Sequence, residues 1–263
     1  MSFTPPVAAL NRGHATLWGN LGDWHDASEY VDAARALAVR LGDVAKLGPG
    51  QRVVDLGAGA GDQLRVWVED FGVGHVTALE LDSVLAARSA SRISEWGLDS
   101  RVRVIAGEAT ATDWGEGGVD RVVALDSAYF FGSHERLLHR SCDALRPGGV
   151  LALTDLLLGD GISARVARVL APYFGIRKGD LQTEPRYRAM LARNGFDQVQ
   201  IHDCTDSVLA GFSEWVRSGG HRRGAALSLP VRAGLSVTAQ VAGRLAGPTG
   251  LRYVLATARR TGT

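Results

Sequence analysis

The sequence predicts an α/β fold in which helices cover both faces of an open, mostly parallel sheet. Two observations carry this prediction. Short apolar runs rich in valine alternate along the chain with segments of helical periodicity. In addition, Gly57, Gly59 and Gly61 directly follow the first apolar run. Glycines in that position are typical of the strand-to-helix turn at which such sheets bind nucleotide-like ligands.

The elements are expected in the following order. Strands are predicted at 52–56, 75–80, 101–106, 121–126, 150–155, 197–202 and 252–258. Helices are predicted near 27–42, 62–71, 83–96, 134–145 and 184–194. The segment RPGG (146–149) is expected to end one helix and turn the chain into the next strand. Thr183 is expected to cap the helix that carries Pro185 in its first turn.

The chain is expected to form a ligand-binding domain over residues 47–263, preceded by a flap over residues 1–46. Helical insertions at about 159–182 and 206–246 flank the sixth strand. Because these segments would lie near the carboxyl ends of the strands, where open α/β sheets bind ligands, we expect the flap and the insertions to cover the active site.

Composition excludes several classes of protein. The 263 residues are 46% hydrophobic, and 29 Lys+Arg against 28 Asp+Glu leave a net charge of +1, so a nucleic-acid partner is not expected. Cys142 and Cys204 are too few and too far apart for a disulfide framework or a zinc site. No signal peptide or run of transmembrane length is visible, so we expect a cytoplasmic protein that does not bind membranes. We expect the protein to be a monomer or a homodimer.

The residues around the glycines indicate what binds there. Asp62 stands where the dinucleotide fingerprint has its third glycine, and a carboxylate beside a pyrophosphate would repel it. Glu80 ends the second strand, where a carboxylate can bind ribose hydroxyls. The expected ligand therefore has a ribose, lacks a pyrophosphate and tolerates Asp55 and Asp62. S-adenosylmethionine, with its adenosine, sulfonium and ammonium groups, meets these conditions.

Several motifs then resemble those of the class I S-adenosylmethionine-dependent methyltransferases. These are VVDLGAGAG, LELD after strand two, AGEAT after strand three, LRPGG before strand five and the final YVLATARR. The resemblance implies a Rossmann-like seven-stranded sheet of order 3-2-1-4-5-7-6 whose last strand is antiparallel. The stretch ALDSAYFF (124–131) resembles the small-molecule subset, in which His often follows the Tyr. Phe130 stands there in this chain, so no role of that His is carried over.

The resemblance also implies a cofactor site. Asp55, Gly57 and Gly59 would line the methionine end, Glu80 would bind the ribose, and Glu108 with Ala109 would meet the adenine. Ala58, Leu81 and Asp126 complete the set of expected cofactor contacts. Two structural alternatives stay open: the glycines could form a tight turn without a ligand, and Glu108 could be a solvated loop carboxylate.

Methyl transfer from a sulfonium needs the acceptor to be held at attack distance and water to be excluded, and no metal is required. A hydroxyl, amine or indole N–H acceptor would also need a base, whereas a carboxylate would not. The catalytic candidates are Asp126, Tyr129 and His14. The substrate-contact candidates are Trp18, Trp24, His25, Tyr129, Asp155 and Tyr173. Ordinary packing, capping or surface roles stay open for each, and such a role is favoured for His134 beside the expected cap Ser133.

These features predict an enzyme that methylates a small, fairly apolar molecule, as in secondary metabolism, and releases S-adenosylhomocysteine. Oxygen is the expected acceptor atom, followed by nitrogen and then electron-rich carbon. One alternative is a protein that binds S-adenosylmethionine but catalyses a non-methylating reaction such as a cyclisation. A second is an NAD(P)-dependent oxidoreductase.

Overall fold

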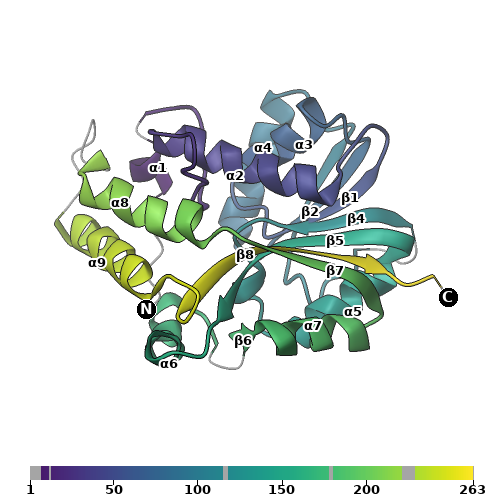
Figure 1. The fold of residues 1–263 in the computed structure, drawn as a ribbon. Helices are drawn as coiled ribbons and strands as arrows, with labels where there is room; N and C mark the ends of the chain where they lie inside the picture. The colour runs from purple at the N-terminus through teal and green to yellow at the C-terminus, as the bar shows by residue number, and fades with distance from the viewer. Residues whose placement is uncertain (1–6, 12, 115–117, 178–179, 221–228, 263) are drawn as a thin grey trace. The chain divides into compact units, whose positions relative to one another are not determined.

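The computed structural model describes residues 7–11, 13–114, 118–177, 180–220 and 229–262. Its sheet has the order β3-β2-β1-β4-β5-β8-β7, with the short β6 paired to β5 (Figure 1). The strands are β1 (Arg52–Leu56), β2 (His75–Glu80), β3 (Val102–Ala106), β4 (Val119–Ala124), β5 (Leu145–Leu158), β6 (Gln182–Thr183), β7 (Phe196–Asp203) and β8 (Leu251–Arg260). With β6 set aside, this is the predicted order 3-2-1-4-5-7-6, and the predicted fold class is confirmed.

The centre of the sheet is parallel and buried on both faces. Strand β1 lies between β2 and β4, and Val53 is in register with Val76 on one side and Arg121 on the other. All residues of β1 after Arg52 are buried, which explains its nearly continuous apolar run. Because β1 to β4 are parallel neighbours, the turns that follow them meet at one edge of the sheet.

Helices cover the two faces of this sheet. Figure 1 shows α3 (Asp62–Glu69) and α4 (Ser83–Glu95) on one face, and α5 (His134–Ala144) and α7 (Glu184–Arg193) on the other. Helix α4 begins where the sequence supplies a cap, since the Asp82 carboxylate accepts hydrogen bonds from Val84 N at 2.8 Å and Leu85 N at 3.1 Å.

The chain divides into two compact units. Residues 38–155, 185–202 and 255–263 form the unit that holds most of the sheet. Residues 1–37, 156–184 and 203–254 form the other unit. The remaining elements are α1 (Val7–Leu10), α2 (Tyr30–Ala45), α6 (Ile162–Leu170), α8 (Gly211–Arg217), α9 (Leu229–Leu245) and the short turns Ala128–Phe130, Ala171–Phe174 and Asp206–Ala210. The predicted insertions at 159–182 and 206–246 fall in the second unit, apart from 178–179 and 221–228, which lie outside the described residues.

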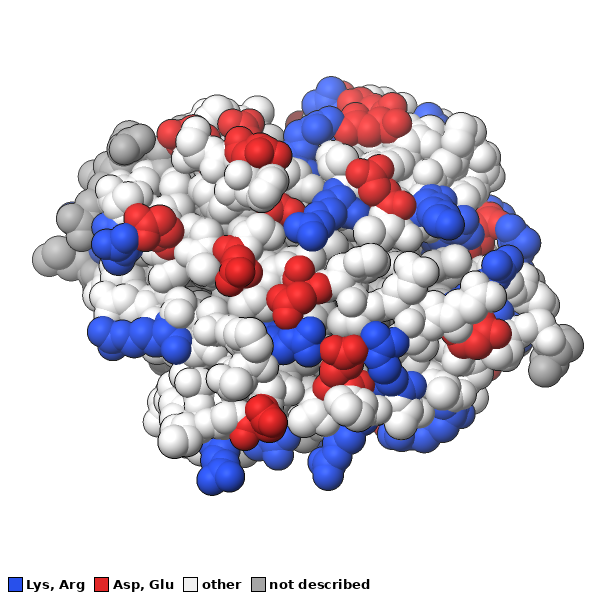
Figure 2. Space-filling view, in the orientation of Figure 1, with Lys and Arg blue, Asp and Glu red and all other residues white. Residues whose placement is uncertain are grey.

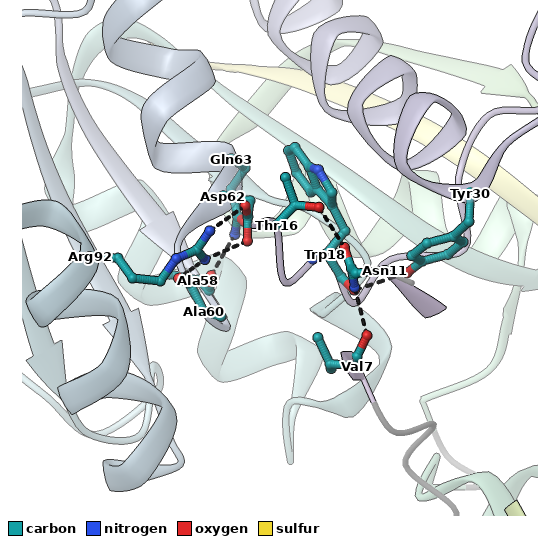
Figure 3. Close-up of polar contacts among 10 residues, drawn as sticks. All are labelled: Val7, Asn11, Thr16, Trp18, Tyr30, Ala58, Ala60, Asp62, Gln63 and Arg92. Atoms are coloured by element: carbon teal, nitrogen blue, oxygen red, sulfur yellow. Dashed lines mark hydrogen bonds and ion pairs between the residues drawn. The ribbon is translucent and has the colours of Figure 1, made fainter. Parts of the chain in front are cut away.

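The second unit is organised around Asn11 and an aromatic cluster. Asn11 is buried, and its amide donates to Val7 O at 2.7 Å and Trp18 O at 2.9 Å (Figure 3). The Tyr30 hydroxyl also donates to Trp18 O, at 3.1 Å. The Trp215 ring centroid lies 5.6 Å from that of Tyr30. The segment before the first strand is therefore held both by its own polar contacts and by packing on Trp215.

Two local features differ from the prediction. The segment 146–149 does not precede the strand as a turn, because β5 already begins at Leu145, which is in register with Val119. The register shifts between Val119 and Arg121, and Gly148 has φ 76°. The Pro-Gly-Gly segment is thus part of strand β5, where it coincides with a register shift in the pairing of β5 with β4. In addition, the two-residue strand β6 was not predicted from the sequence.

One face of the protein carries both charges intermixed. Figure 2 shows Lys and Arg side chains interspersed with Asp and Glu across the face in view, with no extended field of one sign. Within the described ranges, no helix combines the length and the apolar character that crossing a membrane requires.

Candidate active site

The turn after β1 forms the centre of the site. Gly57, Gly59 and Gly61 have φ of 78°, 56° and 90°, which only glycine adopts without strain. A Cβ on Gly57 would lie 2.5 Å from Ser127 Cβ, so that glycine is required by packing. A Cβ on Gly59 would meet no heavy atom of the described residues within 4 Å. The backbone at Gly59 therefore borders open space, in which a ligand can lie against it.

Glu80 joins this turn to the end of β2. Its Oε2 accepts a hydrogen bond from Gly59 N at 2.7 Å, and its Oε1 accepts one from Asp82 N at 2.9 Å. Each carboxylate oxygen has a second lone pair, so both can still accept a hydrogen bond from a ligand hydroxyl. The next residue, Leu81, is 72% exposed. A fixed carboxylate beside an exposed apolar side chain fits a ribose joined to a planar base.

Asp55 places a buried carboxyl group beneath the turn. Its Oδ2 accepts a hydrogen bond from the Trp67 indole, and no described residue offers its Oδ1 a hydrogen bond. Burial raises the pKa of Asp55 to about 7. The Trp67 indole and the Gln63 side chain oppose this rise, and the nearby Glu80 charge adds to it. A buried carboxyl oxygen that lacks a partner fits a ligand bearing a cationic group, such as an ammonium.

Asp62 corrects one step of the sequence argument. Its two carboxylate oxygens pair with Arg92, with both N–O distances at 2.6 Å (Figure 3). The negative charge of Asp62 is therefore neutralised within the protein, and repulsion from it does not exclude a pyrophosphate. The sequence could not show this pairing, because Arg92 lies on another helix, 30 residues further along.

The loop after β3 is held from two sides. The Trp114 indole donates to Ala109 O at 2.9 Å, and Arg140 from α5 donates to Thr112 O at 2.8 Å. Ala109 is buried, whereas Glu108 is exposed and accepts a hydrogen bond from the Thr110 hydroxyl at 2.6 Å. The loop thus presents the Glu108 carboxylate at the surface on a fixed backbone. Its contact with the adenine stays a prediction.

The loop after β4 brings Asp126 and Tyr129 together. Asp126 has φ 53°, an uncommon conformation for a residue with a Cβ, and its N–H donates to the Thr154 hydroxyl. The hydroxyl of the buried Tyr129 donates to Asp126 Oδ1. A non-glycine residue keeps this conformation only where surrounding contacts offset the strain, and such residues cluster at functional sites. Phe130 is 52% exposed and packs on Tyr129.

Asp155 belongs to a buried cluster that the sequence did not reveal. Its Oδ2 lies 2.8 Å from His134 Nε2, and both side chains are at most 3% exposed. The Tyr187 ring lies edge-on to His134, and burial followed by the Asp155 charge raises the pKa of Tyr187. His134 starts the helix after β4 and Asp155 lies near the end of the neighbouring β5. That shared edge of the sheet was the available signal for the pairing.

The remaining predicted residues lie in the second unit. Trp18 is buried, and Trp24 packs on Trp215 with ring centroids 5.1 Å apart. His14 and His25 are exposed, and Tyr173 is 74% exposed. Their contact with a substrate, the closure of residues 1–46 over the site and the division into domains at residue 46 all stay predictions. The described ranges contain no group of three or more His, Cys, Asp or Glu able to hold a metal ion.

The sequence of this chain matches those of known methyltransferases. Residues 53–149 match the family described as "Methyltransferase domain". The chain is 26% identical to erythromycin 3''-O-methyltransferase of Saccharopolyspora erythraea over 75% of this chain and 68% of that protein. It is also 26% identical to sarcosine/dimethylglycine N-methyltransferase of Halorhodospira halochloris, over 80% and 77% of the two chains.

The fold is shared with solved structures at lower identity. The [4+2]-cyclase SpnF superposes with a TM-score of 0.73 at 20% identity, covering 98% of this chain and 94% of that one. The match over residues 53–149 includes the glycine turn, Glu80 and the loops after β3 and β4. Together with the strand order, it shows a methyltransferase domain in the class I S-adenosylmethionine-dependent methyltransferase fold.

Proposed function

We propose that this methyltransferase acts on an oxygen of a small, fairly apolar organic molecule, in secondary metabolism. The observation that carries the proposal is the pair Asp126–Tyr129 after β4. A hydroxyl acceptor must lose its proton during methylation, and a carboxylate held by a tyrosine hydroxyl can take it. The relative erythromycin 3''-O-methyltransferase supports oxygen as the acceptor atom, because that enzyme methylates an oxygen.

The residues of the first unit have separate tasks in this proposal. Asp55, the backbone at Gly57, Ala58 and Gly59, and the Glu80 carboxylate would hold S-adenosylmethionine, which supplies an activated methyl group on a sulfonium. Leu81 and Glu108 with Ala109 would border its base. Their task is to fix the position of the methyl group, because an in-line displacement depends on the alignment of the reacting atoms.

Asp126 would act on the acceptor. Its carboxylate, which accepts the Tyr129 hydroxyl, would take the proton of the acceptor's O–H group as the new O–C bond forms. The hydrogen bond from Asp126 N to Thr154 fixes this carboxylate on its strained backbone. The exposed ring of Phe130, beside Tyr129, would give the acceptor an apolar contact and limit the access of water.

The test uses S-adenosylmethionine labelled with ¹³C in its methyl group. The protein would be incubated with fractionated extracts and with a panel of hydroxylated and amino-bearing apolar compounds, and the labelled product examined by NMR. A ¹³C shift typical of an O-methyl group, with the rate strongly reduced in Asp126→Asn, is the expected result. A label on nitrogen, as the activity of the sarcosine relative would suggest, would contradict the oxygen assignment.

One alternative has an observation in its favour. The structural match to the [4+2]-cyclase SpnF covers nearly the whole chain, so the same fold can host a reaction other than methylation. In that case the substrate would be converted while no S-adenosylhomocysteine forms. Measuring this by-product next to substrate consumption separates the two functions.

A further inference from the structure

We propose that Arg92 is a positioning residue for the cofactor. Although it lies near the end of α4, it holds the glycine turn and the start of α3 in the conformation that binds S-adenosylmethionine. Arg92 would act on the binding of the cofactor alone, whichever acceptor the enzyme methylates.

The buried guanidinium group of Arg92 donates charge-assisted hydrogen bonds to Asp62 and to the backbone of Ala60. Its Nη1 donates to Asp62 Oδ2 at 2.6 Å and to Ala60 O at 2.7 Å, and its Nη2 donates to Asp62 Oδ1 at 2.6 Å (Figure 3). The side chains of Arg92 and Asp62 are 9% and 5% exposed. The guanidinium also lies over the Trp96 ring, 4.5 Å from its centroid. Arginine is suited to this arrangement, because its planar fork can donate to several acceptors at once.

The two groups that Arg92 binds flank the third glycine of the turn. Ala60 precedes Gly61, whose φ is 90°, and Asp62 follows it as the first residue of α3. Helix α4 also packs directly on Gly61, since a Cβ there would lie 2.4 Å from Ser89 Oγ. The conformation of the turn thus depends on a side chain from another helix as well as on its own glycines.

Helix α4 is tied to the cofactor-binding groups at its other end too. Its cap, Asp82, donates from its N–H to Glu80 Oε1, while Glu80 Oε2 accepts from Gly59 N. One helix therefore contacts the turn through Arg92 and connects to the proposed ribose carboxylate through Asp82. Loss of Arg92 should alter the spacing between Gly59 and Glu80, and this change would weaken the binding of the cofactor.

The test compares Arg92→Met and Arg92→Lys with a matched control, Arg101→Met. Arg101 also donates to a backbone carbonyl within this unit, that of Val73, but it lies before β3, at the opposite edge of the sheet from the turn. The dissociation constant of S-adenosylhomocysteine would be measured by isothermal titration calorimetry and the melting temperature by differential scanning calorimetry. Neither measurement needs an acceptor.

We expect Arg92→Met to raise the dissociation constant about tenfold or more, and Arg92→Lys to raise it about threefold to tenfold, because lysine keeps the charge but not the fork. Arg101→Met should lower the melting temperature with a change in the dissociation constant of less than about twofold. A wild-type dissociation constant in folded Arg92→Met would overturn the proposal, as would an equal loss of binding in Arg101→Met. If Arg92→Met does not fold, wild-type binding by Arg92→Lys overturns it.

Discussion

Asp55 is expected to make the stability of the cofactor-free protein fall as the pH rises, and Asp55→Asn should abolish this fall. Burial raises the pKa of this carboxyl group from 3.8 to about 7. The folded protein therefore keeps a proton that the unfolded chain has already lost. This contribution to stability is fully present below the unfolded pKa of 3.8 and is lost as the pH rises through about 7.

The magnitude follows from the two pKa values. Between them, the free energy of unfolding should fall by about 1.4 kcal/mol per pH unit, or about 4 kcal/mol in all. Asparagine can keep the hydrogen bond from Trp67 through its carbonyl oxygen. Its amide N–H groups would then occupy the place of Oδ1, which has no hydrogen-bond partner among the described residues, at a cost of about 1–3 kcal/mol. Above the folded pKa, Asp55→Asn should be the more stable protein by about 1–3 kcal/mol.

The assay is urea denaturation of both cofactor-free proteins at a series of pH values from about 5 to 8. Comparison of the two proteins cancels the contributions of all other titrating groups. Addition of S-adenosylhomocysteine should stabilise the wild type more than the variant, because its ammonium group would favour the ionised Asp55. A difference in free energy of unfolding that stays constant over this pH range would show that the pKa of Asp55 is not raised, and the reasoning would fail.

Four further outcomes are expected. Glu80→Ala should weaken the binding of S-adenosylhomocysteine by about 1–3 kcal/mol in calorimetry, and unchanged binding would mean that the ribose lies elsewhere. Tyr129→Phe should lower kcat by about tenfold or more with an unchanged KM for the cofactor; a purely structural role would instead lower the melting temperature and leave kcat intact. Gly57→Ala should cost about 2 kcal/mol or more of stability in urea denaturation, because its Cβ would lie 2.5 Å from Ser127 Cβ. Gly59→Ala should weaken cofactor binding but lower the free energy of unfolding less than Gly57→Ala does. An equal loss of stability in Gly57→Ala and Gly59→Ala would contradict the open space beside Gly59.

Much of the fold could be predicted because its signals are local. Strands β1 and β2 begin and end at the predicted residues, since each is a short apolar run bounded by turn residues. The cofactor candidates were also accessible, because the turns after parallel neighbouring strands must meet at one edge of the sheet. Asp55, Gly59 and Glu80 lie together for that reason, and their predicted contacts with the cofactor await the measurements above.

The features that escaped prediction depend on contacts between distant side chains. Nothing in the sequence around Asp62 indicates that Arg92 neutralises it. For His134 and Asp155 the sequence indicates a shared edge of the sheet but not the pairing of the two buried side chains. Likewise, Trp24 could have been an exposed aromatic residue of a flap, and only the structure shows its packing on Trp215. Composition and periodicity report which residues are buried. They do not report which of the buried residues are paired.

The ratio of S-adenosylhomocysteine formed to acceptor converted distinguishes methyl transfer from a non-methylating reaction. The purified protein would be given methyl-labelled S-adenosylmethionine and an apolar acceptor found in the extract screen, and both products would be quantified by mass spectrometry. Methyl transfer predicts one S-adenosylhomocysteine for each acceptor that gains a single labelled methyl group. Conversion of the acceptor to a product of unchanged mass, without S-adenosylhomocysteine, would contradict the proposed function and support a non-methylating reaction.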